Sequence, residues 1–428
     1  MIKPGAALLM VKIWKRLLSI FVVFIVIIII SELFLLAVSL TFSKVGALLS
    51  REELKLDISL PDKRLGHRPN PDYPGHDDSK GFRNDHVPVK ADVVALGDSQ
   101  TYGSGVKREL AWPQCLANMG NLEVYNFGFG GYGPVHSLIL MDEALAIKPK
   151  IIVEAFYSGN DLYDAYSMVY YRGSNREMRT RDQSVLKDCE RAEQAKPMRE
   201  EIHEVHRLHL EENEEETHNV LREFVAGHSR LYGLIRALKR RYSKSQLERD
   251  LKYDWDKIKE DLKHGGDKII FFDGGNIKTV FEPRYRFLAL DQENPRISEG
   301  LRLSLLLIKK MNEKAREKGV NFIVLLLPTK ELVFKDVVYE RLKDIPEIYR
   351  ELMENEELMW ENSKKFLKDE GISYVDSLPV LRESLLGGNQ PYWLGLDGHP
   401  NEVGHEVVAR LVLSEIEKRN FLHSTPIP

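Results

Sequence analysis

A serine and a histidine far apart in the sequence have the neighbours expected of a nucleophile and its base. Ser99 lies in GDSQTYG, residues 97–103, and His399 lies in LDGHPN, residues 396–401, two positions after Asp397. A serine hydroxyl becomes a nucleophile when a histidine takes its proton, and a carboxylate fixes the tautomer of that histidine. Structural alternatives are open, because Ser99 and Asp397 are also typical helix N-cap residues. The residue types indicate acyl-transfer chemistry if the fold brings the two segments together.

Two further segments carry donors that suit a developing negative charge. The glycine cluster NFGFGGYG spans residues 126–133 and includes Gly131, and SGND spans residues 158–161 and includes Asn160. Backbone N–H groups and neutral amide side chains stabilise the oxyanion of a tetrahedral intermediate. Taken singly, the glycines indicate a turn and the asparagine an Asx-turn. Their significance depends on the elements that position them.

Strands and helices alternate through most of the chain. Short apolar runs predict strands at 92–96, 123–127, 150–156, 321–327 and 373–375. Helices are predicted at 111–119, 136–146, 301–318, 353–370 and 402–419. This order predicts an α/β fold, a three-layer, doubly wound parallel sheet of the flavodoxin-like kind, with functional residues at the carboxyl ends of the strands. The four polar segments each follow a predicted strand or directly precede the last helix.

The alternation is interrupted in the middle of the chain. We expect residues 91–161 and 296–423 to form the catalytic domain, 43–90 to be an irregular lead-in, and 162–295 to be a mostly helical insertion. Charged helix formers dominate residues 176–264, and the runs Lys268–Phe272 and Tyr285–Leu290 predict a small hairpin or extra strands. The insertion is expected to act as a helical cap over or beside the site.

Residues 17–42 form an apolar run whose only charge is Glu32. At about 1.5 Å per residue, a helix of this length exceeds the ~30 Å hydrocarbon core of a bilayer. Basic residues dominate before the run, whereas both signs are mixed after it, which predicts a cytoplasmic tail at residues 1–16 and a catalytic domain in the periplasm or outside the cell. A cleaved signal peptide is the alternative. The length of the run and the lack of an A-x-A site favour an uncleaved single-pass anchor.

Composition excludes several classes of protein. The 428 residues are 43% hydrophobic and 29% charged, with a formal net charge of −4, so the chain lacks the basic excess that nucleic-acid binding needs. Two cysteines are too few for a disulfide framework or a cysteine-based zinc site. His203, His206 and His209 recur at a spacing that fits no common zinc signature. We therefore expect no metal, no cofactor and no nucleic-acid partner.

Together the four segments resemble the SGNH (GDSL-type) hydrolase family, whose name lists a serine, a glycine, an asparagine and a histidine in successive blocks. The resemblance runs from about Asp92 to Arg410, interrupted by the insertion. It implies Ser99 as nucleophile and its backbone N–H as one oxyanion donor. Gly131, which lies five residues after Asn126, and Asn160 are implied as the other two donors. His399 is implied as general base and Asp397 as its partner.

One departure from the family pattern concerns the last block. Many soluble members have D-x-x-H, whereas this chain has D-x-H in DGHPNEVGH, which resembles a membrane-associated branch that includes polysaccharide O-acetyltransferases of the alginate type. The segment LPTKE at 327–331 resembles the P-x-K segment of such proteins. Lys330 is accordingly a candidate substrate-binding residue, with a solvated loop lysine as the alternative. Tyr132, Tyr157, Tyr163 and Trp393 flank the motifs and are candidates for stacking on a sugar, with core packing as the alternative.

These features predict a serine-dependent esterase that acts on acyl esters, acetyl esters above all, outside the cytoplasm. The expected partners are an acylated carbohydrate or lipid substrate, the membrane through the N-terminal helix, and envelope polysaccharide machinery. One alternative is an O-acetyltransferase of an envelope or exopolysaccharide, which uses the same acyl-enzyme. Another is a non-catalytic subunit of a polysaccharide assembly, although such a subunit has no chemical need for the full set of motif residues.

Overall fold

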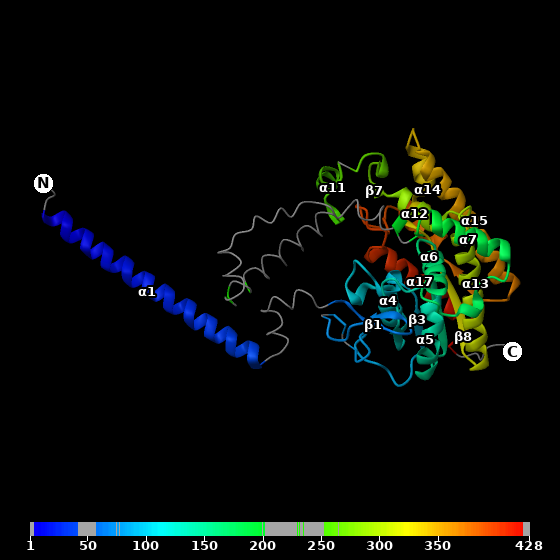
Figure 1. Ribbon diagram of the computed structural model, residues 1–428, viewed down its shortest axis with the longest axis horizontal. Helices are drawn as coiled ribbons and strands as arrows, with labels where there is room; N and C mark the ends of the chain where they lie inside the picture. Colours follow the sequence, from blue (N-terminus) through cyan, green and yellow to red (C-terminus); the bar gives the residue numbers. More distant parts are fainter. Residues whose placement is uncertain are drawn as a thin grey trace. The chain divides into compact units, whose positions relative to one another are not determined.

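The computed structural model (Figure 1) describes residues 4–41, 57–198 apart from 74 and 77, 200–201, 229, 231, 234, 252–263 and 265–422. By contacts the chain divides into two compact units. One comprises Met1–Asp57 with Asn213–Arg249, and the other comprises Ile58–Glu212 with Asp250–Pro428. The predicted histidines at 203, 206 and 209 and the acidic run at 211–217 lie outside the described residues.

The first unit contains the long helix α1, Pro4–Thr41. Its stretch Trp14–Val38 has a mean hydropathy of 3.2 and no burial within the protein. This is the one described helix that is long and apolar enough to cross a membrane, and a signal sequence near an N-terminus has the same properties. The predicted apolar helix at 17–42 is therefore present, and its topology stays a prediction.

The second unit is built on a five-stranded parallel sheet of order β4-β3-β5-β8-β9. The strands are β3 Val93–Leu96, β4 Val124–Asn126, β5 Ile151–Tyr157, β8 Asn321–Leu327 and β9 Tyr374–Asp376. Every residue of β3, β5 and β8 is buried, as expected for a parallel sheet covered on both faces. Because all five strands run the same way, their carboxyl ends meet at one edge.

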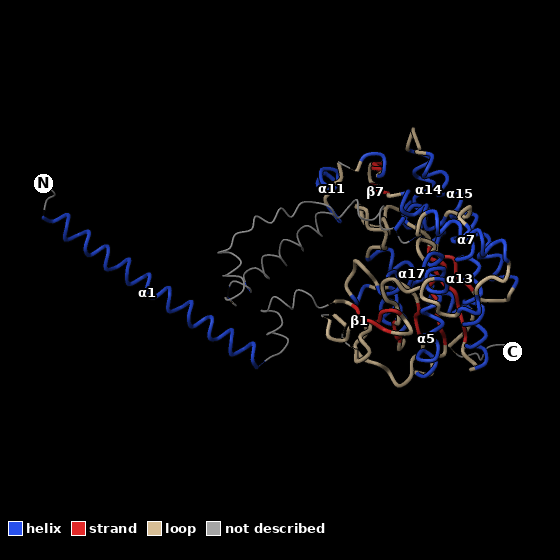
Figure 2. Tube along the Cα trace, in the orientation of Figure 1, coloured by secondary structure: helices blue, strands red, loops and turns tan. Residues whose placement is uncertain are grey.

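Helices form a layer on each face of this sheet (Figures 1 and 2). On one side α13, Pro295–Glu317, packs against α5, Pro134–Ala146, and α6, Asp161–Tyr170. The other layer contains α17, Glu402–Lys418, which packs against α4, Trp112–Gly120, and α16, Leu378–Leu386. Right-handed crossovers place α4 and α5 on opposite faces, because the chain moves in opposite directions along the sheet through them. The predicted parallel sheet with flanking helices is confirmed.

The remaining helices and strands lie around these layers. Two antiparallel hairpins pair β1 with β2 and β6 with β7. Their strands are β1 Ser59–Asp62, β2 Gly66–Pro69, β6 Ile270–Asp273 and β7 Lys278–Phe281. The other α-helices are α3 Ser99–Tyr102, α7 Gln183–Ala195, α11 Trp255–Asp261, α12 Pro283–Leu290, α14 Lys330–Arg341 and α15 Glu347–Asp369. Short 3-10 helices occupy Arg108–Leu110, Arg176–Met178 and Gly266–Lys268.

The structure corrects the prediction for residues 285–290. The predicted run Tyr285–Leu290 is not a strand but belongs to α12, with Pro283 in the first helical turn, where its missing N–H costs no hydrogen bond. The hairpin exists, but its second strand is β7, which ends before Pro283. The lead-in at 43–90 is also less irregular than expected, because it contains the β1–β2 hairpin. Helix α6 follows β5 directly and joins the α5 and α13 layer, although residues from 162 on were expected to belong to the insertion.

Candidate active site

The turn after β3 presents Ser99 at the carboxyl edge of the sheet. Gly97 has φ +145°, and a Cβ there would overlap the Thr101 hydroxyl and lie 3.1 Å from the Ala155 side chain, so the turn requires glycine. Asp98 caps the following helix, because its carboxylate accepts the Gln100 N–H at 2.8 Å. Ser99 is therefore the first residue of α3 rather than its cap, and its side chain is free for another role.

Ser99, His399 and Asp397 form a hydrogen-bonded chain across 300 residues of sequence. His399 Nε2 lies 2.8 Å from Ser99 Oγ, and His399 Nδ1 lies 2.6 Å from Asp397 Oδ1. The same carboxylate oxygen accepts the backbone N–H of His399 at 2.9 Å. With Nδ1–H donating to Asp397, Nε2 carries the lone pair that accepts the serine proton. The three residues therefore have the mutual geometry of a catalytic triad.

The Asp397 carboxylate is kept ionised. Burial by itself would raise the pKa of Asp397, but the hydrogen bond from the His399 ring, the charge of that ring, the His399 backbone N–H and the charge of Lys330 together hold it below its usual range. An ionised carboxylate on Nδ1 stabilises the imidazolium that forms when His399 takes a proton.

Lys330 fixes the loop that carries Asp397 instead of facing a substrate. Its side chain is 1% exposed, and Nζ donates to the carbonyl oxygens of Val280, Gly395 and Asp397 at 2.8, 2.7 and 3.3 Å. Burial lowers the pKa of Lys330 to about 8. The predicted substrate contact is therefore wrong for this residue, and so is the solvated alternative, because three carbonyls enclose the ammonium group.

The expected oxyanion donors lie in the same cavity as Ser99. That cavity has a volume of about 500 Å³, and its lining includes Ser99, Gly131, Asn160, Asp397 and His399. The Asn126 side chain fixes the glycine loop, since Nδ2 donates to Thr101 O at 2.8 Å and Oδ1 accepts Gly128 N–H at 2.7 Å. Asn160 Nδ2 donates to Asp164 Oδ2 at 2.8 Å, and the Asn160 side chain also hydrogen-bonds Asp98, which lowers the pKa of that carboxyl.

Three buried carboxyl groups, those of Asp98, Asp161 and Asp164, lie near the Asn160 amide. Burial raises the pKa of Asp98 to about 6, against the opposing effects of the Gln100 N–H and of His399. Burial, with the charge of Asp98 as the next cause, raises the pKa of Asp161 and of Asp164 well above its usual value. Burial therefore favours the neutral forms of Asp161 and Asp164 beside the oxyanion donors.

Of the four aromatic candidates, two line the cavity and two do not. Tyr157 and Tyr163 are lining residues. Tyr132 is 1% exposed, stacks on His136 at 4.6 Å and donates its hydroxyl to His67 O, and Trp393 is 2% exposed in a cluster with Val106 and Ala111. The predicted sugar contacts of Tyr132 and Trp393 are thus replaced by core packing.

Sequence reasoning missed the contribution of α12 to the cavity. Glu282, at the N-cap of α12, and Tyr285, Arg286 and Ala289 of the helix itself are lining residues, and all four lie in the predicted insertion. A strand at 285–290, as predicted, would place Arg286 and Ala289 on opposite faces. In the helix that forms instead, residues three apart share a face, so both can line the cavity. Among the described residues, no cluster of three or more histidine, cysteine or acidic side chains is arranged to hold a metal ion.

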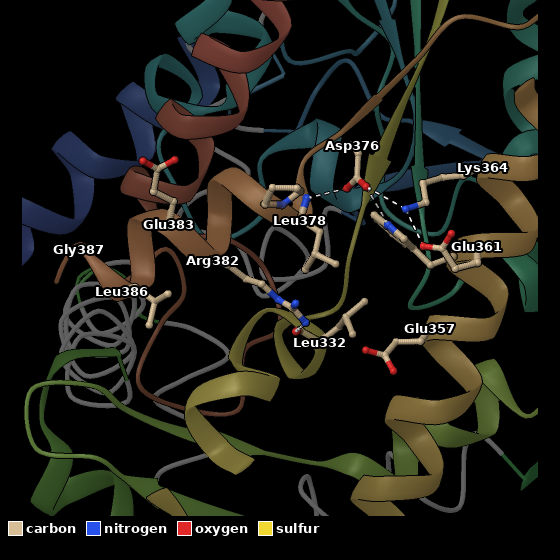
Figure 3. Close-up of a pocket in the computed structure, with 12 residues that line it drawn as sticks. Leu332, Glu357, Glu361, Lys364, Asp376, Leu378, Arg382, Glu383, Leu386 and Gly387 are labelled. Atoms are coloured by element: carbon tan, nitrogen blue, oxygen red, sulfur yellow. Dashed lines mark hydrogen bonds and ion pairs between the residues drawn. The ribbon is translucent and has the colours of Figure 1, made fainter. Parts of the chain in front are cut away.

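A larger cavity lies away from the triad, between α14, α15, α16 and the end of β9 (Figure 3). Its volume is about 930 Å³. Lys364 pairs with Glu361 at 2.6 Å and with Asp376 at 3.5 Å, and Asp376 also accepts the Trp360 indole N–H and the Leu378 backbone N–H. Arg382 donates to Leu332 O at 2.9 Å. The lining contains no serine, cysteine or histidine, so it offers no nucleophile of these types.

The solved structures that resemble this chain include lipolytic proteins of the G-D-S-L family. A Desulfitobacterium hafniense protein assigned to that family is 15% identical, with a TM-score of 0.33, over 75% of this chain and 97% of its own. A Veillonella parvula family member is 12% identical (TM-score 0.33; 76% and 98% coverage), and a GDSL-like lipase from Bacteroides thetaiotaomicron is 11% identical (TM-score 0.32; 76% and 88%). No protein-family model matches the sequence, and no curated protein matches it. Similarity at this level carries no function to the chain, which has to be argued from its own site.

Proposed function

We propose that this protein is a serine-dependent ester hydrolase of the SGNH (GDSL) type. The observation that supports it most strongly is the chain of hydrogen bonds from Ser99 through His399 to Asp397, at 2.8 and 2.6 Å, at the wall of a cavity that also contains Gly131 and Asn160. A nucleophile with a base in contact, a carboxylate orienting that base and donors facing the same space make up the machinery of acyl transfer.

The first half of the reaction transfers the acyl group to the serine. His399 Nε2 takes the hydroxyl proton as Ser99 Oγ attacks the ester carbonyl carbon, and the carbonyl oxygen becomes an oxyanion. The Ser99 and Gly131 N–H groups and the Asn160 amide stabilise that oxyanion. The C–O bond to the alcohol then breaks, and the imidazolium gives its proton to the departing alkoxide. Asp397 stabilises the imidazolium throughout.

The second half releases the acyl group. Water loses a proton to His399 Nε2 and attacks the acyl carbon of Ser99, and the carboxylic acid leaves as the proton returns to Ser99 Oγ. A sugar hydroxyl in place of water gives transfer instead of hydrolysis by the same steps.

The finer features of this proposal concern the acyl group and the location. For the acyl group we propose acetyl, which is what the resemblance of DGHPNEVGH to polysaccharide O-acetyltransferases implies. The apolar helix α1 and the basic residues in and before it favour a catalytic unit held at the outer face of a membrane by an uncleaved anchor.

The test is single-turnover acylation of the full chain in detergent with 4-nitrophenyl acetate. We expect a burst of nitrophenol and an acetyl group on the peptide that contains Ser99, detected by mass spectrometry. Ser99→Ala is expected to lose both signals while keeping the wild-type circular dichroism spectrum. Release that persists in folded Ser99→Ala would exclude the proposal. Addition of a sugar acceptor during turnover distinguishes transfer, which yields an acetylated sugar, from hydrolysis, which yields acetate alone.

A further inference from the structure

Arg286 places a guanidinium group in the wall of the catalytic cavity. The residue comes from α12 and lines the same cavity as Ser99 and His399. Its side chain is 13% exposed. The proposed hydrolysis of a neutral ester does not require this cation. The oxyanion is stabilised by the oxyanion donors, and the imidazolium of His399 is stabilised by Asp397.

The surroundings fix the position of the guanidinium. Arg286 Cζ lies 5.0 Å from the centre of the Tyr285 ring and 5.8 Å from that of Tyr157. Nη2 occupies the space that a Cβ of Gly398 would need, so the guanidinium lies against the backbone between Asp397 and His399. Only glycine at position 398 permits this approach. The arginine is thus held beside the triad by three neighbours.

The hydrogen-bonding capacity of Arg286 is left unused. Its ion pair with Glu331 has a 3.9 Å separation between Nε and Oε2, beyond hydrogen-bond distance, and no described residue accepts a hydrogen bond from its side chain. Glu282 is a second acidic residue in the cavity lining. A guanidinium has five N–H donors, and leaving buried donors unpaired is costly. A guanidinium whose N–H groups have no acceptor in the protein is suited to bind a ligand that supplies hydrogen-bond acceptors.

Tyr157 adds an independent observation at the same place. The side chain is 2% exposed, and its hydroxyl is buried with no hydrogen-bond partner among the described residues. Burial raises the pKa of Tyr157 well above its usual value, so the hydroxyl stays a donor at neutral pH. Tyr157 lines the cavity at the carboxyl end of β5, directly before the segment that contains Asn160.

We propose that Arg286 and Tyr157 form an anion-binding subsite, and that the substrate is an ester that carries a carboxylate group close to the ester bond. The planar fork of arginine matches the two oxygens of a carboxylate, and a tyrosine hydroxyl is a suitable third donor. The inference rests on the proposed esterase function and adds the class of substrate. It explains why a cation and an unpaired hydroxyl are retained side by side next to Ser99.

The test compares carboxylate esters with their own methyl esters on the full chain. One pair, 4-acetoxybenzoate and methyl 4-acetoxybenzoate, carries the anion on the alcohol side, and the other, 4-nitrophenyl hemisuccinate and its methyl ester, carries it on the acyl side. We expect the wild-type kcat/KM to favour the carboxylate in one pair by about 10-fold or more, mainly through KM. Which pair shows the preference identifies the side of the ester on which the subsite lies.

Substitutions separate a binding role from a structural one. Arg286→Gln is expected to lower the ratio of carboxylate to methyl ester kcat/KM by about 10-fold, Tyr157→Phe by a few-fold, and Arg286→Lys to retain part of it. Arg284→Gln, on the exposed side of the same helix, is the matched control and is expected to keep the wild-type ratio. Equal losses for both members of a pair in Arg286→Gln would overturn the subsite.

A binding measurement on the wild type keeps the inference testable if the variants misfold. Benzoate should inhibit the hydrolysis of phenyl acetate competitively, at a concentration at least about 10-fold lower than benzamide. Equal inhibition by the two compounds, or a wild type that prefers neither carboxylate ester, would exclude the anion subsite while leaving the esterase in place. Failure to hydrolyse any of the esters would instead exclude the proposed function.

Discussion

The two cavities described above differ in size and in the chemistry of the groups that line them. The cavity of about 930 Å³ in Figure 3 is the larger, and in its wall Lys364 pairs with Asp376 while Arg382 donates to Leu332 O and keeps an unpaired Nε. The cavity of about 500 Å³ contains Ser99 in contact with a base, an unpaired Tyr157 hydroxyl, and Arg286, whose ion pair with Glu331 spans 3.9 Å. Volume therefore does not identify the site. The contact of a serine with a histidine that a carboxylate orients does so, because that arrangement supplies a nucleophile together with its base.

Substitution of the nucleophile should give the largest difference between the two cavities. Ser99→Ala is expected to lower kcat/KM for 4-nitrophenyl acetate by about 10⁴-fold or more, because no other described group of the cavity contacts His399 Nε2 in its place. Glu383→Gln, at an exposed residue lining the larger cavity, is the matched control and should stay within about 2-fold of wild type. If Ser99→Ala and Glu383→Gln lowered kcat/KM by similar factors, the smaller cavity could not be assigned as the active site in preference to the larger one.

The carboxylate of the triad should have the next largest effect. Asp397→Asn keeps the size of the side chain but favours the wrong tautomer of His399, and we expect a loss of about 10³- to 10⁴-fold in kcat. Rates measured from pH 5 to 9 should show this loss throughout the neutral range. A loss below 10-fold would show that Asp397 only supports the loop.

Removal of the Asn160 amide tests the oxyanion site. Asn160→Ala is expected to lower kcat by about 10²-fold with little change in KM, since the donor acts on charge that develops only in the transition state. The variant also removes the hydrogen bond to Asp164, so thermal unfolding should be measured alongside the kinetics. An effect confined to KM would place Asn160 in ground-state binding.

The smallest expected effect concerns the pH dependence of thermal stability that comes from Glu154, a buried residue of the sheet. Burial raises the pKa of Glu154, a fully buried residue of β5, from its ordinary value of 4.5 to about 8. The folded protein therefore favours the protonated form, and the resulting stability is present below pH 4.5 and is lost as the pH rises through about 8. Glu154→Gln should make Tm fall less between pH 5 and 9 than in wild type, by a few degrees.

Glu383→Gln is again the control, because an exposed carboxyl should leave the slope of Tm against pH unchanged. The raised pKa values of Asp98, Asp161 and Asp164 also contribute to the wild-type slope, so Glu154→Gln should remove only part of it. A slope equal to that of wild type would mean that Glu154 does not ionise over this range.

Much of the scaffold follows from local sequence patterns. The strands β5 and β8 are runs of buried apolar residues bounded by polar turns, so their predicted bounds agree with the structure to within one residue. Residues 285–290 were mispredicted because Tyr285, Phe287 and Leu290 favour a strand, whereas the proline at position 283 begins a helix. Tertiary context overrides propensity most readily in segments this short.

The candidate site was predictable only as far as its motifs extend. Ser99, Asn160 and His399 stand in recognisable segments, and the structure brings all three to one cavity. The substrate-binding role predicted for Lys330 is wrong because its partners, Val280, Gly395 and Asp397, lie 50 or more residues away in the sequence. Trp393 is close to His399 in the sequence, but its side chain packs with Val106 and Ala111 and does not line the cavity. Proximity along the chain is therefore a poor guide to the lining residues.

The hydrogen bonds of Lys330 have a consequence for how this protein can be shortened or recombined. One of its acceptors is Val280 of β7, outside the repeating strand–helix units, and the other two belong to the loop before His399. A minimal catalytic fragment that omits the β6–β7 hairpin would leave a buried ammonium group short of an acceptor, directly behind the base. The hairpin thus belongs to the smallest fragment that keeps the candidate site intact, and chimeras should exchange it together with the histidine loop.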